Sequence, residues 1–423
     1  MRSSWPATSL RPEAVAAGSA GGAAARDGDA AGEGPVLLIA AQSARALVCA
    51  ARRAGFVPLA VDLFGDDDTA ALSAGSRRVA GLGAVGVSRA FEDMLARHGP
   101  CDVAGLVLGS GFEGRPGLVA ALSGRFGLLG NAAEVMRRAK DPFALAALCR
   151  EAGVPHPEVR PASRVDGVGD AAGAGWLLKR RGASGGGHVR AMHGPAPSRG
   201  CYAQRRVAGA AVSACFVADG RRATLLGFSA QWSDPAPGAA FRYGGAVRPA
   251  ACRFEAELAE AVARLARALG LVGLNGADFL VGRDGFHLIE INPRPGASLD
   301  VFADALPMRL HVAACRDGAL PDAAPPLPRA TAAVVAYAAR DGRVAPGFAW
   351  PDWAADRQRV GQIRAGAPFC TATATADRPE AARRLAVARA AALLGRAGLS
   401  PARLTRVRRH RPGATPPIGA HAA

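Results

Sequence analysis

Two carboxylates and one amide in the segment 276–295 stand at spacings that could hold a metal ion. Two short apolar stretches flank a turn there, and Gly285 suits the left-handed last position of a three-residue hairpin loop with a bulge. Pairing across that loop predicts that Asp278 faces Glu290, with Asn292 on the same face. Carboxylates about 5 Å apart repel each other unless a cation or a shared proton lies between them. Because Asn292 adds a neutral oxygen, the three side chains suit hard Mg²⁺ better than a shared proton.

The competing interpretation is an exposed hairpin whose acids are hydrated by solvent. Apolar residues on both faces argue against it, since alternation places Leu280 and Leu288 beside the acids. The residues expected on the other face are Phe279, Val281, Ile289 and Ile291. A sheet that is covered on both sides does not leave two carboxylates without a partner. The same alternation predicts that His287 points away from Glu290 and that Arg294 lies next on the acidic face.

Lys140 and Lys179 are the only lysines among 52 basic residues. Two lysines retained in an arginine-rich chain indicate sites that need a compact ammonium rather than a planar guanidinium. Lys179 ends an apolar strand and precedes a loop that contains Gly182, Gly185, Gly186 and Gly187. The backbone N–H groups of such a loop can approach a polyphosphate without hindrance from Cβ atoms. A flexible surface hairpin is an equally weighted alternative for the loop taken alone.

Lys140 precedes a strong helix-start pattern. Asp141 is suited to the N-cap and Pro142 to the first helical position, and an apolar-periodic helix then runs to the Gly-terminated turn at 153–157. The alternative is that Lys140 is an ordinary surface residue, which is less credible in a chain with only two lysines.

The order of elements predicts an α/β fold. Apolar runs at 36–41 and 57–63 enclose a helical stretch at 44–54, which is a βαβ opening. A strand at 103–108 and a helix at 116–123 extend it into half of a Rossmann-like layer. Because the turn after the first strand has no GxGxxG pattern, a dinucleotide is not expected there.

Five segments are expected along the chain: a disordered leader at 1–34, a Rossmann-like domain at 35–130, a central domain at 131–322, a small C-terminal lobe at 328–400 and a basic tail at 401–423. A proline-rich stretch from Pro321 to Pro328 is the natural linker before the lobe. Within the lobe we expect strands at 331–339 and 368–375 and a helix at 379–395.

Composition excludes several classes of protein. The chain has 423 residues with 50% hydrophobic and 21% charged residues, and its 8 cysteines are scattered without a CxxC pair, which excludes a disulfide scaffold and a zinc ribbon. No run of about 18 apolar residues occurs, so we expect a cytoplasmic protein without a membrane span. The formal net charge of +17 comes almost wholly from arginine. Arginines dispersed over a hydrated surface, concentrated somewhat at 403–411, are favoured over a nucleic-acid groove.

These motifs resemble those of the ATP-grasp superfamily, in the expected order over about 131–306, and the carbamoyl-phosphate-synthase-like members in particular. The resemblance implies that Lys140 and Lys179 contact phosphates and that the glycine loop, with Gly185, Gly186 and Gly187, is a flexible lid. The segment 202–207 resembles the hinge that pairs with adenine, which implicates Gln204 and Val207.

The resemblance also implies roles for the acidic hairpin. Asp278, Glu290 and Asn292 would be the metal ligands, and Arg294 would act with Lys179 in catalysis. The first domain resembles the domain that precedes ATP-grasp cores, and the lobe resembles one that follows some of them.

The activity that the resemblance implies is that of an ATP-dependent, ADP-forming carboxylate–amine ligase that makes a carbon–nitrogen bond through an acyl phosphate. Its cofactors would be ATP and Mg²⁺, with Mn²⁺ as an alternative, and its partners a small-molecule carboxylate and an amine. A homodimer is one expected assembly, and neither a membrane nor a nucleic acid is an expected partner. The whole chain also resembles ATP-grasp proteins encoded with tetrahydromethanopterin- and methanofuran-linked one-carbon genes. The rival interpretations are a non-catalytic nucleotide-binding ATP-grasp module and a basic nucleic-acid-binding protein.

The hinge departs from the family pattern. Gln204 stands where a glutamate is usual, and a G-x-E-x-S pattern downstream has Ala211 in place of its glutamate. Without this glutamate the residues that would contact the ribose are undefined. The predicted metal site does not depend on it. No general base is obvious, because His188 is expected on the lid surface and His287 on a packed face.

Overall fold

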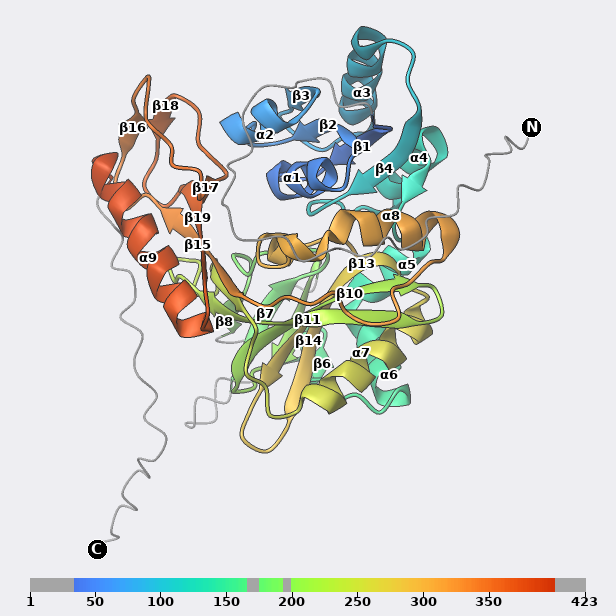
Figure 1. Ribbon diagram of the computed structural model, residues 1–423. Coiled ribbons are helices and arrows are strands. Elements are labelled where there is room, and N and C mark those ends of the chain that lie inside the picture. The colour runs from blue at the N-terminus through green and yellow to red at the C-terminus, as the bar shows by residue number, and fades with distance from the viewer. Residues whose placement is uncertain (1–33, 166–174, 193–198, 400–423) are drawn as a thin grey trace, which may run out of the picture. The chain divides into compact units, whose positions relative to one another are not determined.

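The computed structural model describes residues 34–165, 175–192 and 199–399 (Figure 1). The expected leader, apart from Gly34, and the expected basic tail lie outside these residues. Helices occur with both parallel and antiparallel sheets, so the predicted α/β class is confirmed. Within the described ranges no helix combines the length and the apolarity that crossing a membrane requires. All eight cysteines are free thiols.

A five-stranded parallel sheet forms the first part of the fold, in the order β3-β2-β1-β4-β5. Its strands are β1 (Val36–Ala40), β2 (Val57–Asp62), β3 (Gly75–Arg78), β4 (Val103–Leu108) and β5 (Leu128–Leu129). The helices are α1 (Arg45–Arg53), α2 (Asp67–Leu72), α3 (Ala84–His98) and α4 (Pro116–Phe126). β1 and β2 are buried along their whole length, which explains their nearly unbroken apolar runs. The predicted βαβ opening is confirmed, whereas the half-exposed edge strand β3 has no apolar run that would predict it.

The carboxyl ends of β1, β2 and β4 lie at one edge of this sheet, because parallel strands all end on the same side. Polar residues follow each of these ends. Ser43 comes after β1, Asp66 after β2, and Ser110 and Glu113 after β4.

Two short helices, α5 (Ala133–Lys140) and α6 (Pro142–Glu151), lead from the first sheet to the next one. Asp141 caps α6 as predicted, since one of its carboxylate oxygens accepts hydrogen bonds of 2.9 Å from the N–H groups of Phe143 and Ala144. Lys140 is the last residue of α5, so a helix on either side fixes its backbone.

A four-stranded antiparallel sheet follows, in the order β6-β9-β7-β8. It contains β6 (Val159–Arg160), β7 (Trp176–Arg180), β8 (Arg190–Met192) and β9 (Cys201–Arg205), and the 3₁₀ turn η1 (Ala162–Arg164) follows β6. The glycine loop predicted after Lys179 connects β7 to β8.

An eight-stranded antiparallel sheet has the order β14-β13-β10-β11-β12-β15-β19-β17. Its strands are β10 (Ala210–Asp219), β11 (Ala223–Ser233), β12 (Tyr243–Arg248), β13 (Val272–Val281), β14 (Phe286–Asn292), β15 (Ala330–Tyr337), β17 (Ala354–Ala355) and β19 (Pro368–Ala376). The strands β16 (Gly342–Val344) and β18 (Gly361–Ile363) pair separately. β15 and β19 confirm the strands predicted there. Because β15 pairs with β12, the sheet continues past the proline-rich linker.

Helices cover both faces of the large sheet. α7 (Glu255–Leu269) buries one side through Leu258, Val262, Leu265 and Leu269, whose spacing of three and four residues is that of one helix face. α8 (Pro307–Asp317), which follows the 3₁₀ turns η2 (Ala297–Asp300) and η3 (Ala303–Ala305), packs on β10 and β13 and also contacts α1 and β5. Alternate residues of β10 face the two helices, so the two buried clusters lie on opposite sides of the sheet.

The last helix, α9 (Pro379–Arg396), lies along β15 and β19 (Figure 1). Its buried residues Ala382, Ala386 and Ala390 recur every four positions, and their small side chains let the helix approach an alanine-rich face of the sheet closely. The predicted helix at 379–395 is confirmed.

Candidate active site

The hairpin of β13 and β14 brings the two acids together in the predicted register, with Asp278 opposite Glu290. One step towards the turn the register shifts, because Phe279 pairs with Leu288 and no residue of β13 lies opposite Ile289. Ile289 is therefore the extra residue of a β-bulge. The bulge turns Ile289 and Glu290 to the same side of the sheet, and both line the same cavity.

This bulge makes three predicted orientations wrong. Leu288 is buried in the core instead of flanking the acids. Ile289 lines the cavity beside Glu290 instead of lying on the opposite face. His287 pairs with Leu280, which lines the cavity, so His287 lies on the face of the acids rather than the opposite one.

The predicted turn is also wrong in detail. Gly285 does not adopt a left-handed conformation, and the turn spans four residues closed by a 2.8 Å hydrogen bond from the Gly282 N–H to the Gly285 carbonyl. The irregularity lies within β14 rather than at the turn, where strict alternation of side chains cannot reveal it.

The two carboxylates have different surroundings. Asp278 accepts a hydrogen bond of 2.8 Å from the Asn292 amide and another from the Ser213 hydroxyl. Burial raises the pKa of Asp278, and the nearby charge of Glu290 raises it further. Burial opposes ionisation of Glu290 too, but the charges of Lys140, Lys179 and Arg294 together outweigh it and lower the pKa of Glu290. Of the two acids, Glu290 therefore has a cation in contact with it, whereas Asp278 has none among the described residues.

The Lys140 ammonium reaches this site from the end of α5. Besides its ion pair with Glu290, it lies 3.2 Å from the Ile291 carbonyl and 3.5 Å from the Asn292 amide oxygen. It contacts two of the three side chains that the sequence predicts as metal ligands. The side chain of Lys140 is only 6% exposed, so it is not an ordinary surface lysine.

The second lysine is held by the hinge strand. Lys179 on β7 pairs with Tyr202 on β9, and its ammonium donates a hydrogen bond of 3.1 Å to the Gln204 side-chain oxygen. Burial lowers the pKa of Lys179, and the charge of Glu290 partly offsets that effect. The glutamine that replaces the usual hinge glutamate therefore positions a lysine with its side chain.

Arg294 is fixed by an acid from the first part of the fold. Its Nε donates to the Glu113 carboxylate at 2.7 Å, and both side chains are buried. The other Glu113 oxygen accepts a hydrogen bond of 2.6 Å from the Gly111 N–H. Burial alone would raise the pKa of Glu113, but Arg294 and then Lys140 outweigh it and hold the pKa at about 2. Glu113 was not predicted as a site residue.

The glycine loop between β7 and β8 is shaped by close backbone contacts. Gly182, Gly185 and Gly186 adopt positive φ angles of +66°, +80° and +75°. Gly187 does not have a positive φ. A Cβ atom on Gly186 would lie 1.9 Å from the Phe241 carbonyl oxygen. The loop therefore needs glycine at position 186 both for its conformation and for its contact.

His188, at the end of this loop, is not on the lid surface as predicted. It lines the cavity, and its Nδ1 is buried without a hydrogen-bond partner among the described residues. Burial lowers the pKa of His188 to about 4, so the imidazole is neutral at pH 7. His156 nearby is buried in the same way, with a pKa also lowered to about 4.

Most of the predicted site residues line one cavity of about 590 Å³. Those that line it are Lys179, Gly185, Gly186, Gly187, Gln204, Val207, Asp278, Glu290, Asn292 and Arg294. Lys140 lines a small recess with Gln204 and Glu290, which also belong to the larger cavity. The structure thus brings all the predicted site residues to one place.

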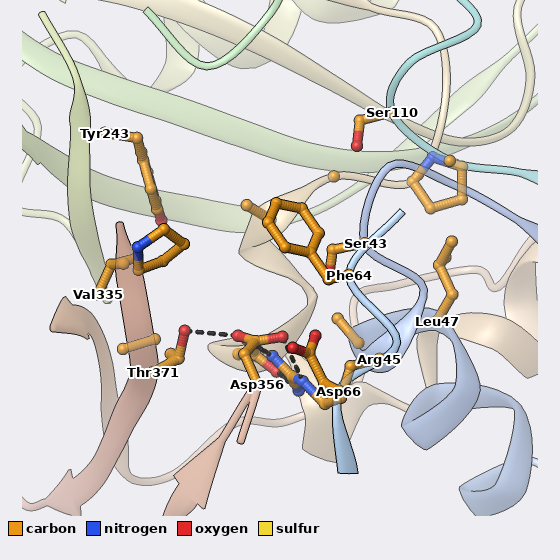
Figure 2. Close-up of a pocket in the computed structure, with 18 of the residues that line it drawn as sticks. Ser43, Arg45, Leu47, Phe64, Asp66, Ser110, Tyr243, Val335, Asp356 and Thr371 are labelled. Atoms are coloured by element: carbon orange, nitrogen blue, oxygen red, sulfur yellow. Dashed lines mark hydrogen bonds and ion pairs between the residues drawn. The ribbon is translucent and has the colours of Figure 1, made fainter. Parts of the chain in front are cut away.

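A second cavity of about 230 Å³ adjoins the first and was not predicted (Figure 2). The two cavities share Ser110, Tyr243, Arg294, Gly296 and Ala297. Figure 2 shows Arg45, Asp66 and Asp356 close together in this second cavity, with Thr371 hydrogen-bonded to Asp356. Polar residues directly after β1, β2 and β4 are the sequence signal that could have located it, since ligands bind at the carboxyl edge of parallel sheets.

Comparison with known proteins assigns the central part of the chain. Residues 139–298 match a family model described as the ATP-grasp domain. The matched residues, which make up less than half of the chain, are similar to that family. No curated protein is close enough in sequence to count as a match.

Several solved structures share the fold of the ATP-grasp domain and its neighbours in this chain. Biotin carboxylase from Campylobacter jejuni superposes with a TM-score of 0.63 at 16% identity, over 85% of this chain and 90% of its own. L-amino acid ligase from Bacillus licheniformis gives 0.61 at 14% identity, over 84% and 96%. N5-carboxyaminoimidazole ribonucleotide synthetase from Thermotoga maritima gives 0.59 at 15% identity, over 84% and 97%.

The donor set in the hairpin fits a hard divalent cation. Asp278, Glu290 and Asn292 offer two carboxylates and an amide oxygen, the ligand types that Mg²⁺ prefers. Across the described ranges no group of three or more His, Cys, Asp or Glu side chains is placed to hold a metal. A cation at the hairpin would therefore depend on Asn292 as well as the two acids.

The buried ion pair of Glu113 and Arg294 should dominate local stability. Glu113→Gln should lower the free energy of unfolding by about 3 kcal/mol at pH 7, because it leaves a buried guanidinium without its counter-charge. Glu134→Gln removes an exposed ion pair with Arg137, which solvent screens, and should leave the free energy of unfolding nearly unchanged. Urea denaturation of both variants and the parent protein checks this prediction.

The pH dependence of that difference has a definite sign. The folded-state pKa of Glu113 is lowered, so its contribution is complete above the unfolded-state pKa and is lost as the pH falls towards about 2. The parent protein and Glu113→Gln should therefore converge in stability between about pH 4.5 and 2. A difference that persists unchanged at pH 2.5 would show that the charge of Glu113 is not what stabilises Arg294.

Proposed function

We propose that the chain is an ATP-dependent carboxylate–amine ligase that forms an acyl phosphate and releases ADP and phosphate. The observation that carries the proposal is the convergence of two lysines, one arginine and two opposed carboxylates on one cavity and the small recess that shares Glu290 with it. An array of this kind suits phosphoryl transfer, in which positioning and charge neutralisation supply most of the catalysis. The name of one similar structure, an L-amino acid ligase, supports the choice of a carboxylate as phosphoryl acceptor, because an amino acid carries a carboxylate.

The proposal assigns each residue a task. The hinge at Gln204 and Val207 would pair with adenine through its backbone. Lys140 and Lys179 would contact the phosphates under the glycine loop. Asp278, Glu290 and Asn292 would hold Mg²⁺ or Mn²⁺, which when bound neutralises phosphate charge.

Arg294 and Lys179 would perform the catalytic task by stabilising the transferring phosphoryl group. A carboxylate oxygen of the acid attacks the terminal phosphorus as the bond from that phosphorus to ADP breaks. The neutral amine nitrogen then attacks the carbonyl carbon and the carbon–nitrogen bond forms. Phosphate leaves with the electron pair of the carbon–oxygen bond, and the proton that the nitrogen loses passes to this phosphate. Because Glu113 fixes the Arg294 side chain, its positive charge is placed before the substrate arrives.

Further parts of the proposal rest on resemblance alone. These are a role in one-carbon cofactor biosynthesis, membership of the corresponding ATP-grasp subgroup, a homodimer and a cytoplasmic location. The division into a Rossmann-like domain, an ATP-grasp domain of 131–322 and a C-terminal lobe of 328–400 is likewise our proposal.

Asp278→Asn tests the reaction with a matched control. The variant should lower ADP formation with MgATP, hydroxylamine and a panel of small carboxylic acids about a hundredfold or more, because one of the two charged cation ligands loses its charge. Its melting temperature should not fall, since removal of one of two close like charges relieves repulsion. Asp284→Asn, in the exposed turn of the same hairpin, should leave the rate unchanged.

The products decide between this function and its rival. Hydroxamate together with ADP is expected from the parent protein with the right acid, and AMP with pyrophosphate would contradict the acyl-phosphate route. Tight binding of nucleotide without hydroxamate for any acid would favour a non-catalytic nucleotide-binding module.

Two adjacent residues of the glycine loop, Gly186 and Gly187, offer a second matched comparison. Gly186→Ala should weaken ADP binding in the presence of Mg²⁺ about tenfold or more, because the added methyl group meets the Phe241 carbonyl and the backbone conformation is strained. Gly187→Ala should bind nearly as well as the parent, since nothing lies within 4 Å of its Cβ position. Equal affinities of the two variants, measured by calorimetry, would show that the loop does not shape the nucleotide site.

A further inference from the structure

The second cavity has a mostly apolar wall. Leu47, Phe64, Tyr243, Pro295 and Val335 contribute to it, and its volume is about 230 Å³. An apolar cavity of about 150 Å³ is large enough to bind benzene. The cavity can therefore hold an apolar body the size of one aromatic ring with a small polar group attached.

The buried arginine at the base of this cavity is already neutralised. Arg45 donates two hydrogen bonds to Asp300, at 2.5 and 2.6 Å, and two to Asp356, at 2.9 and 3.0 Å. Four of its five N–H groups are used in this way. Arg45 therefore does not provide a site for an anionic ligand.

Asp66 stands apart from the other acids of this cluster. Asp62 accepts hydrogen bonds from the N–H groups of Ala44 and Gly65, and Asp68 accepts one from the Arg357 N–H. The Asp66 carboxyl lines the cavity and is 3% exposed, yet it has no hydrogen bond or ion pair within the described part of the chain. Its oxygens therefore need a hydrogen-bond partner from the cavity, which a ligand or a water molecule supplies.

The surroundings of Asp66 are acidic. Burial, and then the charges of Asp356, Asp68 and Asp62, raise the pKa of Asp66 to about 8, and Arg45 offsets this only in part. A bound cation would reverse that balance by favouring the ionised carboxylate.

We propose that this cavity binds a primary ammonium group on a ring-sized apolar body, with Asp66 as the counter-ion of the ammonium. The inference rests on the proposed function to the extent that this amine would be the one that captures the acyl group, after its ammonium has given one proton to the Asp66 carboxylate. The geometry favours that role, because Arg294, Tyr243 and Ser110 line both this cavity and the one that holds the phosphate-binding residues.

An amine fits the site better than a carboxylic acid does. Both arginines near the cavity are paired with carboxylates, Arg45 with Asp300 and Asp356 and Arg294 with Glu113. An anion would meet the uncompensated acid Asp66, whereas an ammonium would complete its hydrogen bonding.

Calorimetry without ATP tests this inference separately from catalysis. The probes are benzylamine, benzyl alcohol and benzoate, which share a ring but differ in charge. At pH 8.5 benzylamine should bind about tenfold or more tightly than either of the others, because its ammonium meets an ionised carboxylate. Benzoate binding as tightly as benzylamine, or no benzylamine binding at millimolar concentration, would overturn the proposal.

Asp66→Asn should weaken benzylamine binding about tenfold or more at pH 8.5, since the counter-charge is lost. Asp67→Asn is the matched control, because Asp67 is the next residue, is exposed and does not line the cavity. That control should bind benzylamine within about twofold of the parent, and melting temperatures should show both variants folded. Equal affinity of Asp66→Asn and the parent would contradict the assignment.

A pH series on the parent protein needs no variant. Binding of an ammonium to ionised Asp66 should release one proton below pH 8, so affinity should rise about tenfold per pH unit towards 8 and then level off. No histidine, lysine or cysteine lines the cavity. The charged groups that face Asp66 are Asp62, Asp68, Asp300, Asp356 and Arg45. An affinity independent of pH between 6 and 8 would overturn the proposal, whereas failure of ligase activity alone would leave benzylamine binding intact.

Discussion

Two half-buried carboxylates that face each other, Asp278 and Glu290, impose the constraint on which the rest of the site depends. Two like charges at this separation are stable only with positive charge beside them. Lys140 meets part of that need from the end of α5 and Lys179 another part from β7. The positive charges of the site therefore come from two separate elements, α5 and β7. The positions at which these elements end place the two ammonium groups beside the acids.

The same constraint explains why the first part of the fold takes part. Arg294 follows the acidic strand by two residues and would add an uncompensated charge on its own. Glu113, after β4, neutralises and orients it. The loop that carries Glu113 also carries Ser110, which lines both cavities. The loop after β4 thus fixes the Arg294 side chain and also lines both cavities.

Much of this arrangement could be predicted from the sequence. The pairing of Asp278 with Glu290 was predicted from a three-residue turn, and it holds because the longer turn and the bulge at Ile289 offset each other in the register. The two lysines are conspicuous because the chain has no others. The bulge at Ile289 could not be predicted, since an inserted residue leaves no mark in a run of apolar side chains. The contact of Glu113 with Arg294 could not be predicted either, because 181 residues separate them and only the packed fold brings them together.

The central claim is that these charges converge on the outer phosphates of a nucleotide held with a divalent cation. Calorimetric titration of the parent protein with ADP and AMP, each with and without Mg²⁺, tests it without knowledge of the substrates. The account predicts that ADP binds about tenfold or more tightly than AMP, and that only ADP gains affinity from Mg²⁺. Equal affinity for the two nucleotides, or an ADP affinity that Mg²⁺ does not change, would contradict it.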